Sequence, residues 1–134
     1  MVRQAAPPSG QLPPVEAHLR DGTTVPLAGL AAEASERHLA RHPEEIARHG
    51  PYTADWCRHD LQWVLAWAVQ DADGQPLDLL DQLDWLARIL VARDYPAASL
   101  ADALDELAAV VAPTLGGAAA RLRLGAERVR QAAA

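Results

Sequence analysis

Apolar residues recur every three or four positions from Leu27 onward, and short breaks containing Pro or Gly divide this pattern into segments. That spacing is typical of helices that bury one face, whereas a half-buried strand alternates every second residue. The breaks predict helices over about 27–41, 43–49, 53–70, 76–94, 99–112 and from 115 toward the C-terminus. Because the turns between these segments are short, the sequence predicts an all-α fold of five or six packed helices.

The N-terminal part of the chain has a different pattern. Residues 1–14 are rich in Pro, Gly and Gln, which predicts a mobile lead-in. Apolar and polar residues then alternate over 15–19 before an Arg-Asp-Gly turn, a pattern that fits either a small hairpin or an extended arm. We therefore expect a flexible lead-in and arm over 1–28 and a single helical domain over 29–134.

Composition and charge exclude several classes of protein. The 134 residues include 18 acidic and 12 basic residues, for a net charge of -6, and phosphate contacts dominate nucleic-acid binding. The single cysteine, Cys57, excludes an intramolecular disulfide and a multi-cysteine metal site. No apolar run reaches the roughly 18–20 residues of a membrane span, and no signal-peptide pattern precedes residue 28. We expect a cytoplasmic protein without a metal, a nucleic-acid partner or a membrane.

Aromatic residues are scarce and gathered in one place. The chain has four Trp, two Tyr and no Phe. Four of these six residues surround the only cysteine: Tyr52, Trp56, Trp63 and Trp67. This clustering makes the helix predicted over 53–70 the first place to search for a site.

A helical wheel of that segment places polar groups on an apolar face. At about 100° per residue, Cys57, Asp60 and Val64 lie between a flank of three indoles and a flank formed by Leu61 and Ala68. A buried carboxylate is costly unless it is paired with a charge or receives several hydrogen bonds. The carboxylate therefore needs a partner.

Two interpretations supply that partner. In the first, Asp60 pairs with an arginine of a neighbouring helix, Cys57 is a small buried apolar residue and the tryptophans belong to the core. In the second, Asp60 accepts hydrogen bonds from the N–H groups of a flat conjugated ligand, the indoles enclose it, and Cys57 lies near one end. The wheel alone favours the first interpretation, and the combination of Trp, Asp and Cys on one helix favours the second.

The same residues belong to a longer similarity. The Cys57–Asp60 sequence, an aromatic-rich segment and the turn at Ala72–Gly74 resemble the C-x-R-D chromophore helix of phycobiliproteins and its A-G-D-like turn. Leu86–Arg88 and Tyr95–Ser99 are similar to the L-R-E-x-Y-L-A-L-G-x-P-x-x-S stretch of that family. Residues 31–52 resemble the helix and G-P-Y-like loop that precede the chromophore cysteine.

The resemblance covers roughly residues 29–112 and implies a globin-like fold that binds a linear tetrapyrrole (a bilin), such as biliverdin or a reduced relative. It implies that Cys57 is the cysteine that forms a thioether with the bilin. It also implies that Asp60 receives the N–H groups of the central pyrroles. The candidate site residues are then Tyr52, Trp56, Cys57, His59, Asp60, Trp63, Val64, Trp67, Arg88 and Tyr95.

The sequence departs from the family in two respects. His59 stands where phycobiliproteins usually have a propionate-binding arginine, so Arg88 or Arg93 is a candidate for that contact. Only about 28 largely non-helical residues precede the first helix, where phycobiliproteins have an extra helical pair that builds their assemblies. The chain therefore looks more like the simpler globins that accompany bilin biosynthesis. The resemblance implies a homodimer or a heterodimer with a related globin.

Other ligands and activities have weaker support. All five histidines precede Asp60, so the helix that would carry the proximal ligand of a haem has none, and we expect no conventional haem site. His38, His42 and His49 fall in a polar stretch and are predicted to be solvated, and the helix dipole explains the Glu44–Glu45 pair. No catalytic constellation stands out, so we do not expect an enzyme.

Two functions remain open. The first is a bilin carrier or photosensory chromophore protein. The alternative is a globin-like sensor or regulatory interaction module that binds neither haem nor bilin and acts through protein contacts.

Overall fold

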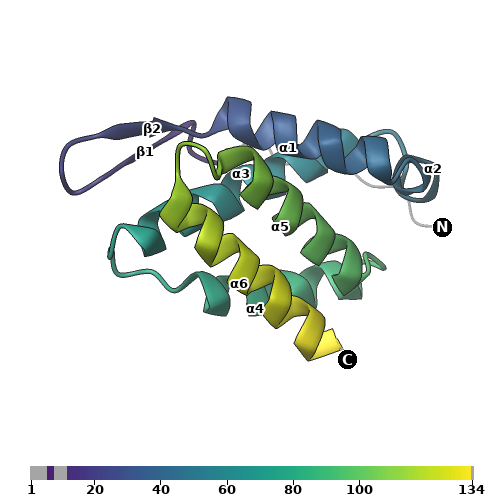
Figure 1. The fold of residues 1–134 in the computed structure, drawn as a ribbon. Coiled ribbons are helices and arrows are strands. Elements are labelled where there is room, and N and C mark those ends of the chain that lie inside the picture. The colour runs from purple at the N-terminus through teal and green to yellow at the C-terminus, as the bar shows by residue number, and fades with distance from the viewer. Residues whose placement is uncertain (1–5, 8–11, 134) are drawn as a thin grey trace.

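The computed structural model describes residues 6–7 and 12–133. The described part of the chain forms a two-stranded hairpin followed by six helices (Figure 1), which confirms the predicted all-α fold. The elements are β1 (Glu16–His18), β2 (Thr24–Pro26), α1 (Ala28–Arg41), α2 (Glu44–His49), α3 (Thr53–Ala72), α4 (Leu79–Ala92), α5 (Ala97–Val111) and α6 (Gly116–Ala133). Most of the lead-in predicted to be mobile, over 1–14, lies outside the described residues. Among the described helices, none combines the length and apolar character that crossing a bilayer requires.

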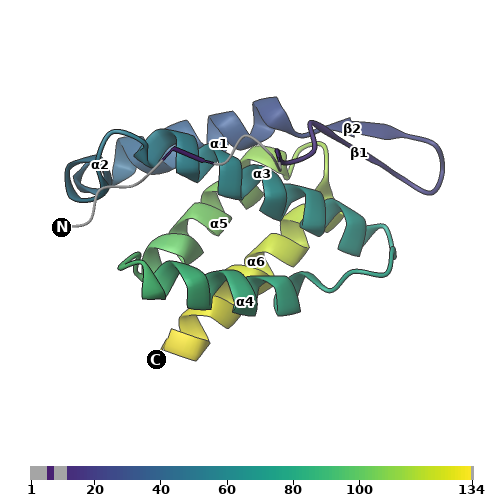
Figure 2. The same ribbon diagram turned by 180° about the vertical axis from the view of Figure 1, so that it is seen from behind.

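Helices α1, α3, α5 and α6 enclose the core, and α4 covers it less completely. α5 packs against α6 and α1, and α3 packs against α1 and α6. α4 packs mainly on α6 and more sparsely on α3, and Figure 2 shows α3 and α4 on the same side of the molecule. Fully buried leucines fill the centre, among them Leu65, Leu104, Leu107 and Leu122. The sparse contact between α3 and α4 leaves room for a groove.

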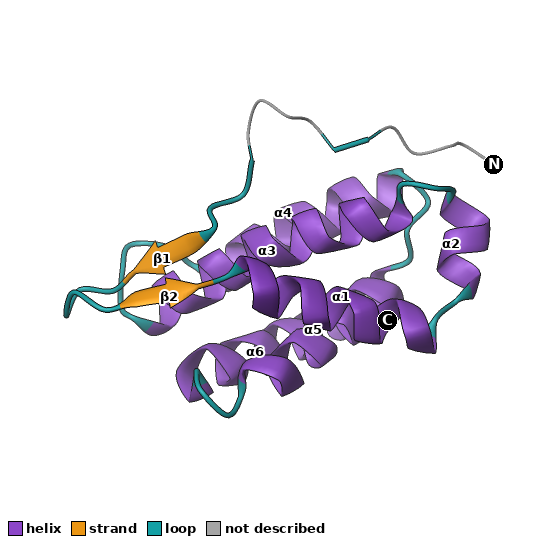
Figure 3. Ribbon diagram, turned by 90° about the horizontal axis from the view of Figure 1, so that it is seen from above, coloured by secondary structure: helices purple, strands orange, loops and turns teal. Residues whose placement is uncertain are grey.

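The arm is a hairpin rather than an isolated extended segment. Glu16 lies opposite Pro26, and Ala17 lies opposite Val25 in an antiparallel register. Gly22 closes the connection with a φ of 91°, a left-handed conformation that glycine adopts without strain. Although the hairpin tip extends past the helices (Figure 3), Ala17 and Val25 are buried in the same core as the helices. The arm is therefore anchored to the helical body.

Two helices begin elsewhere than the sequence predicts. α4 begins after Asp78, whose carboxylate accepts a hydrogen bond from the N–H of Leu80 at 2.9 Å. This side-chain cap satisfies a backbone donor that would otherwise lack a partner, so it determines where the helix starts. α5 begins at Ala97, directly after Pro96, two residues before the predicted cap Ser99.

The C-terminal end of α4 is a well-defined turn. The N–H of Asp94 donates to the carbonyl of Val91 at 3.0 Å, and the N–H of Tyr95 donates to that of Leu90 at 2.8 Å. This pair of bonds is a Schellman motif, which places Asp94 in the left-handed conformation, with a φ of 64°. The turn fixes the directions in which Arg93 and Tyr95 leave the helix.

Candidate functional site

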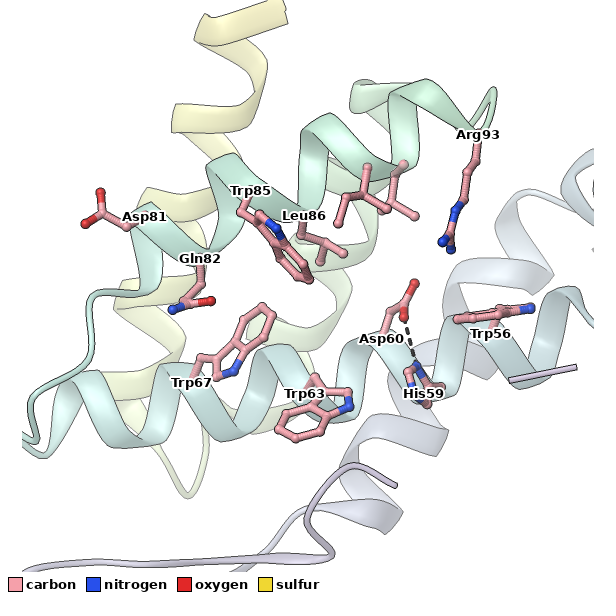
Figure 4. A pocket seen from close by; sticks show the side chains of 12 residues that line it. Trp56, His59, Asp60, Trp63, Trp67, Asp81, Gln82, Trp85, Leu86 and Arg93 are labelled. Carbon is pink, nitrogen blue, oxygen red and sulfur yellow. Dashed lines mark hydrogen bonds and ion pairs between the residues drawn. The ribbon is translucent and has the colours of Figure 1, made fainter. Parts of the chain in front are cut away.

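A groove of about 710 Å³ separates α3 from α4 (Figure 4). All four tryptophans of the chain line it: Trp56, Trp63 and Trp67 from α3 and Trp85 from α4. The other lining residues are His59, Asp60, Asp81, Gln82, Leu86, Ile89, Leu90 and Arg93. A cleft of this size with mostly apolar walls and a few polar groups is typical of small-molecule sites.

The spacing of residues along α3 explains how its side chains reach the groove. Trp56, Asp60, Trp63 and Trp67 follow one another at intervals of four, three and four residues, which places them on one face of the helix. The adjacent face packs in the core, and Val64, a predicted site residue, is fully buried there. The helical wheel therefore identified the correct helix. The groove lies on the tryptophan flank and Asp60, not on the face centred between Cys57 and Val64.

Three indoles and the His59 ring line the α3 side of the groove. The ring centroids of Trp63 and Trp67 lie 6.3 Å apart with their planes tilted by 34°. The ring of Trp56 meets that of His59 edge-on, with centroids 5.3 Å apart. Trp85 stands on the opposite wall and is 49% exposed. Such flat faces suit a planar conjugated molecule, because aromatic pairs are stable in offset and edge-to-face arrangements.

Asp60 pairs with its neighbour in the sequence. His59 Nδ1 lies 3.0 Å from Asp60 Oδ1, and the exposed fractions of the two side chains are 15% and 21%. Among the described residues, no arginine lies within ion-pair distance of Asp60, so this part of the first interpretation is not found, whereas Cys57 packs against the core as that interpretation expects. The carboxylate projects into the groove (Figure 4), where it can accept hydrogen bonds from a ligand.

The arginine at the groove is Arg93. Its Cζ lies 5.8 Å from the ring centroid of Trp56, within the range of a cation–π contact. Arg88, one turn earlier on α4, is exposed and is not among the lining residues. Of the two arginines that the sequence offered as an anion contact, the structure brings only Arg93 to the aromatic residues of α3.

A second polar cluster is formed by buried side chains of α1 and α2 together with Tyr95 from the turn between α4 and α5. His38 Nε2 is 2.7 Å from Glu45 Oε2, and the Tyr95 hydroxyl donates to Glu45 Oε1 at 2.8 Å. His38, Glu45 and His49 are all buried. Burial and the charge of Glu45 raise the pKa of the Tyr95 hydroxyl well above its usual range.

This buried cluster corrects two predictions. His38 and His49 were predicted to be solvated, but His38 is fully buried against Glu45, and the ring of His49 lies 5.5 Å from that of Tyr95. His42 is partly buried. Glu45 is not explained by the helix dipole alone, since its side chain accepts hydrogen bonds from other elements.

Cys57 belongs to the interior rather than to the groove. Its side chain packs against the hydrophobic core and is not among the groove lining. The pKa of the thiol is raised to about 11, chiefly by burial; a hydrogen bond with Ser35 opposes the shift, and the charges of Glu45 and Asp60 contribute to it. A protonated thiol in such surroundings is a poor nucleophile.

The structure divides the ten predicted site residues into two equal sets. Trp56, His59, Asp60, Trp63 and Trp67 line the groove. The others lie elsewhere: Tyr52 is exposed before α3, Cys57 and Val64 face the interior, Arg88 faces away from the groove, and Tyr95 joins the buried cluster. Among the described residues, no group of three metal-binding side chains comes together.

Sequence reasoning offered only arginines from α4 and missed the other residues that this helix contributes. The residues Gln82, Leu86, Ile89 and Arg93 are spaced by four, three and four, which is the same spacing as the lining residues of α3. Two helices with matching rows, one of which also carries the remaining tryptophan, Trp85, are a signal for a shared groove. The stronger leucine stripe of the same helix obscured that row.

Comparison with protein-family models, curated proteins and solved structures gives no match for this chain. The function is therefore inferred from the residues of the groove.

Proposed function

We propose that the groove between α3 and α4 binds a linear tetrapyrrole such as biliverdin, and that the protein carries or displays this chromophore. The observation that supports the proposal is that all four tryptophans line the same groove as Asp60. A bilin is long, flat and conjugated, with pyrrole N–H groups on one edge and carboxylates on the other. The indoles suit its faces, and Asp60 suits its N–H edge.

The role proposed for Asp60 is to hold the pyrrole nitrogens. A protonated tetrapyrrole is a cation with several N–H donors, and an ionised carboxylate both neutralises the charge and accepts those hydrogen bonds. His59, with a proton on Nδ1, donates to Asp60 Oδ1 at 3.0 Å and so orients the carboxylate. The second carboxylate oxygen is then available to the ligand.

The proposed binding is non-covalent. A thioether to the ligand would require Cys57 to reach the groove, but its side chain packs on the core beside Ser35 of α1. This differs from the covalent attachment that the resemblance to phycobiliproteins implies. Whether the pigment stays attached after denaturation distinguishes non-covalent from covalent binding.

The test is co-expression of the chain with a haem oxygenase, followed by absorbance spectroscopy and denaturing electrophoresis with zinc staining. We expect a coloured protein that loses its pigment on denaturation, both in the wild type and in Cys57→Ala. Pigment that stays attached in the wild type only would contradict non-covalent binding. A colourless product that also fails to bind added biliverdin would overturn the proposed function.

A matched pair of carboxylate variants locates the ligand. Asp60→Asn should keep the fold and shift or weaken the red absorption band. Asp55→Asn removes a carboxylate from the same helix that pairs with Arg58 at 2.9 Å outside the groove, and its spectrum should match the wild type. An Asp60→Asn spectrum identical to that of the wild type would remove Asp60 from the site.

A second candidate function is a regulatory interaction module without a bilin. The half exposure of Trp85 favours it, because a partner protein could cover this indole. In that case biliverdin should not bind, and Trp85→Ala should weaken self-association or partner binding. In either case we propose that the protein is cytoplasmic and forms a homodimer or a heterodimer with a related globin. Sedimentation analysis of the purified chain would test whether it forms a homodimer.

A further inference from the structure

Helix α2 is attached to the rest of the molecule by ionisable side chains. It lies at the edge of the molecule (Figure 3) and spans only Glu44–His49, and a helix of that length is marginal in water without support from its surroundings. The two residues that it buries are Glu45 and His49, whereas its one large apolar residue, Ile46, is 46% exposed. The position of α2 therefore depends on groups that can titrate rather than on apolar packing.

Glu45 is the anchor of this attachment. One oxygen lies 2.7 Å from His38 Nε2 of α1, and the other accepts a hydrogen bond from the Tyr95 hydroxyl, in the turn between α4 and α5, at 2.8 Å. On the α3 side, the charges of Glu45 and Asp60 act on the thiol of Cys57. An ionised carboxylate accepts from two donors at once, whereas a protonated one has lost part of that capacity.

His49 is the acid-sensitive member of the attachment. Its ring is buried against the ring of Tyr95, with centroids 5.5 Å apart, and its Nε2 has no hydrogen-bond partner among the described residues. The ion pair beside it joins Arg48 to Asp94 at 3.1 Å, and no ion pair within the described part of the chain includes His49. A second proton on this ring would create a buried cation that no carboxylate pairs with, which is costly.

His42 is the nearby group that acts in the opposite direction. Its ring centroid lies 4.6 Å from that of His38, and its nitrogens face Glu44 at 3.3 Å and Asp102 at 3.7 Å. A proton on His42 would strengthen both of these contacts. Because they involve partly exposed side chains, they contribute little, and the buried groups determine the response to acid.

We propose that α2 is an acid-released latch, which is docked near neutral pH and detaches locally when His49 gains a proton, while the other helices stay folded. Release brings the imidazole into water, so the released state binds more protons than the docked state. By linkage, the released population rises as the pH falls. Histidine changes its charge between about pH 5 and pH 8, and release is expected in that range.

The latch has a consequence for the groove. Asp94 and Tyr95 both bind side chains of α2, and they directly follow Arg93, which contacts Trp56 at one end of the groove. Release of α2 would therefore remove the side-chain contacts that hold this turn from outside. The inference does not depend on what the groove binds.

The test is hydrogen–deuterium exchange of the purified full chain at pH 7.5 and pH 5, compared as protection factors so that the pH dependence of intrinsic exchange is removed. Protection over 43–50 should fall roughly 10-fold or more, because a proton bound only on release shifts the equilibrium by up to about tenfold per pH unit. Protection over 100–110 in α5 should not change. Constant protection over 43–50, or an equal loss in α5, would overturn the proposal.

Three variants assign the effect to one imidazole. His49→Phe places a ring that cannot gain a proton against Tyr95, and His49→Gln is a second uncharged variant. In both, protection over 43–50 should be the same at the two pH values, and this ratio, rather than the level of protection, is the criterion. His18→Gln removes an exposed histidine of the hairpin and should keep the wild-type loss. A wild-type loss in both His49 variants would refute the role of His49.

Discussion

Cys57 should make the stability of the fold depend on pH in the alkaline range. The fold raises the pKa of its thiol from 9.0 to about 11, chiefly by burial. Below pH 9 the thiol is protonated in both the folded and the unfolded chain, so its contribution to stability is fully present. Above pH 9 the unfolded chain releases the proton first, and stability is lost until the folded thiol also ionises near pH 11.

The size of the effect follows from the shift. One pKa unit corresponds to about 1.4 kcal/mol, so the free energy of unfolding should fall by about 2–3 kcal/mol between pH 9 and pH 11 because of this thiol. The perturbation is Cys57→Ala, which cannot titrate. The smaller side chain lowers stability by a constant amount at all pH values and leaves the alkaline slope shallower.

The assay is urea unfolding under reducing conditions, followed by circular dichroism at pH 8, 9, 10 and 11. Tyr95, whose pKa is also raised, is present in both proteins, so the difference between the two curves reports Cys57. Parallel stability curves for the wild type and Cys57→Ala would refute the reasoning that burial raises the pKa of the thiol. A thiol reagent provides a second check, since it should react slowly with the folded chain at pH 8 and rapidly in urea.

Two further substitutions test the interior by urea unfolding. Tyr95→Phe removes the hydroxyl that donates to the buried Glu45 at 2.8 Å and should cost about 1.5–3 kcal/mol of unfolding free energy; a loss below about 0.5 kcal/mol would show that Glu45 needs no such donor. Gly125→Ala would place a methyl group of α6 against Leu83 Cδ1 of α4 and should cost about 1–3 kcal/mol. Gly116→Ala, at a site with open space around the glycine, is the control and should be neutral or slightly stabilising, so equal effects at the two sites would contradict the close approach.

The sequence predicts the helices well because their information is local. The apolar spacing of each helix, with Pro or Gly in the turns, located all six helices with shifts of a few residues at their ends. The exceptions have local chemical causes, such as the side chain of Asp78, which caps α4 later than expected. Hairpin and extended arm could not be distinguished, because that choice depends on pairing between β1 and β2.

The buried cluster shows what local reasoning cannot supply. The stretch containing His38 and Glu45 is polar and has the composition of a solvated surface. Its main donor, Tyr95, follows Glu45 by 50 residues, so only the packing of the α4–α5 turn onto α1 and α2 reveals that these groups are buried together. Trp85 and Gln82 were missed for the same reason, since they reach the groove only through the pairing of α3 with α4.

The concentration of tryptophan in one groove has an optical consequence. Indole fluorescence responds to the polarity and quenching groups around each ring, and here every indole of the chain lies at a single site. Emission excited selectively from tryptophan therefore reports on the groove and not on the leucine core. A chromophore bound there would quench most of the emission by energy transfer without any added label. During unfolding, emission and helical circular dichroism would follow different parts of the molecule, so their coincidence would show that the groove and the core melt together.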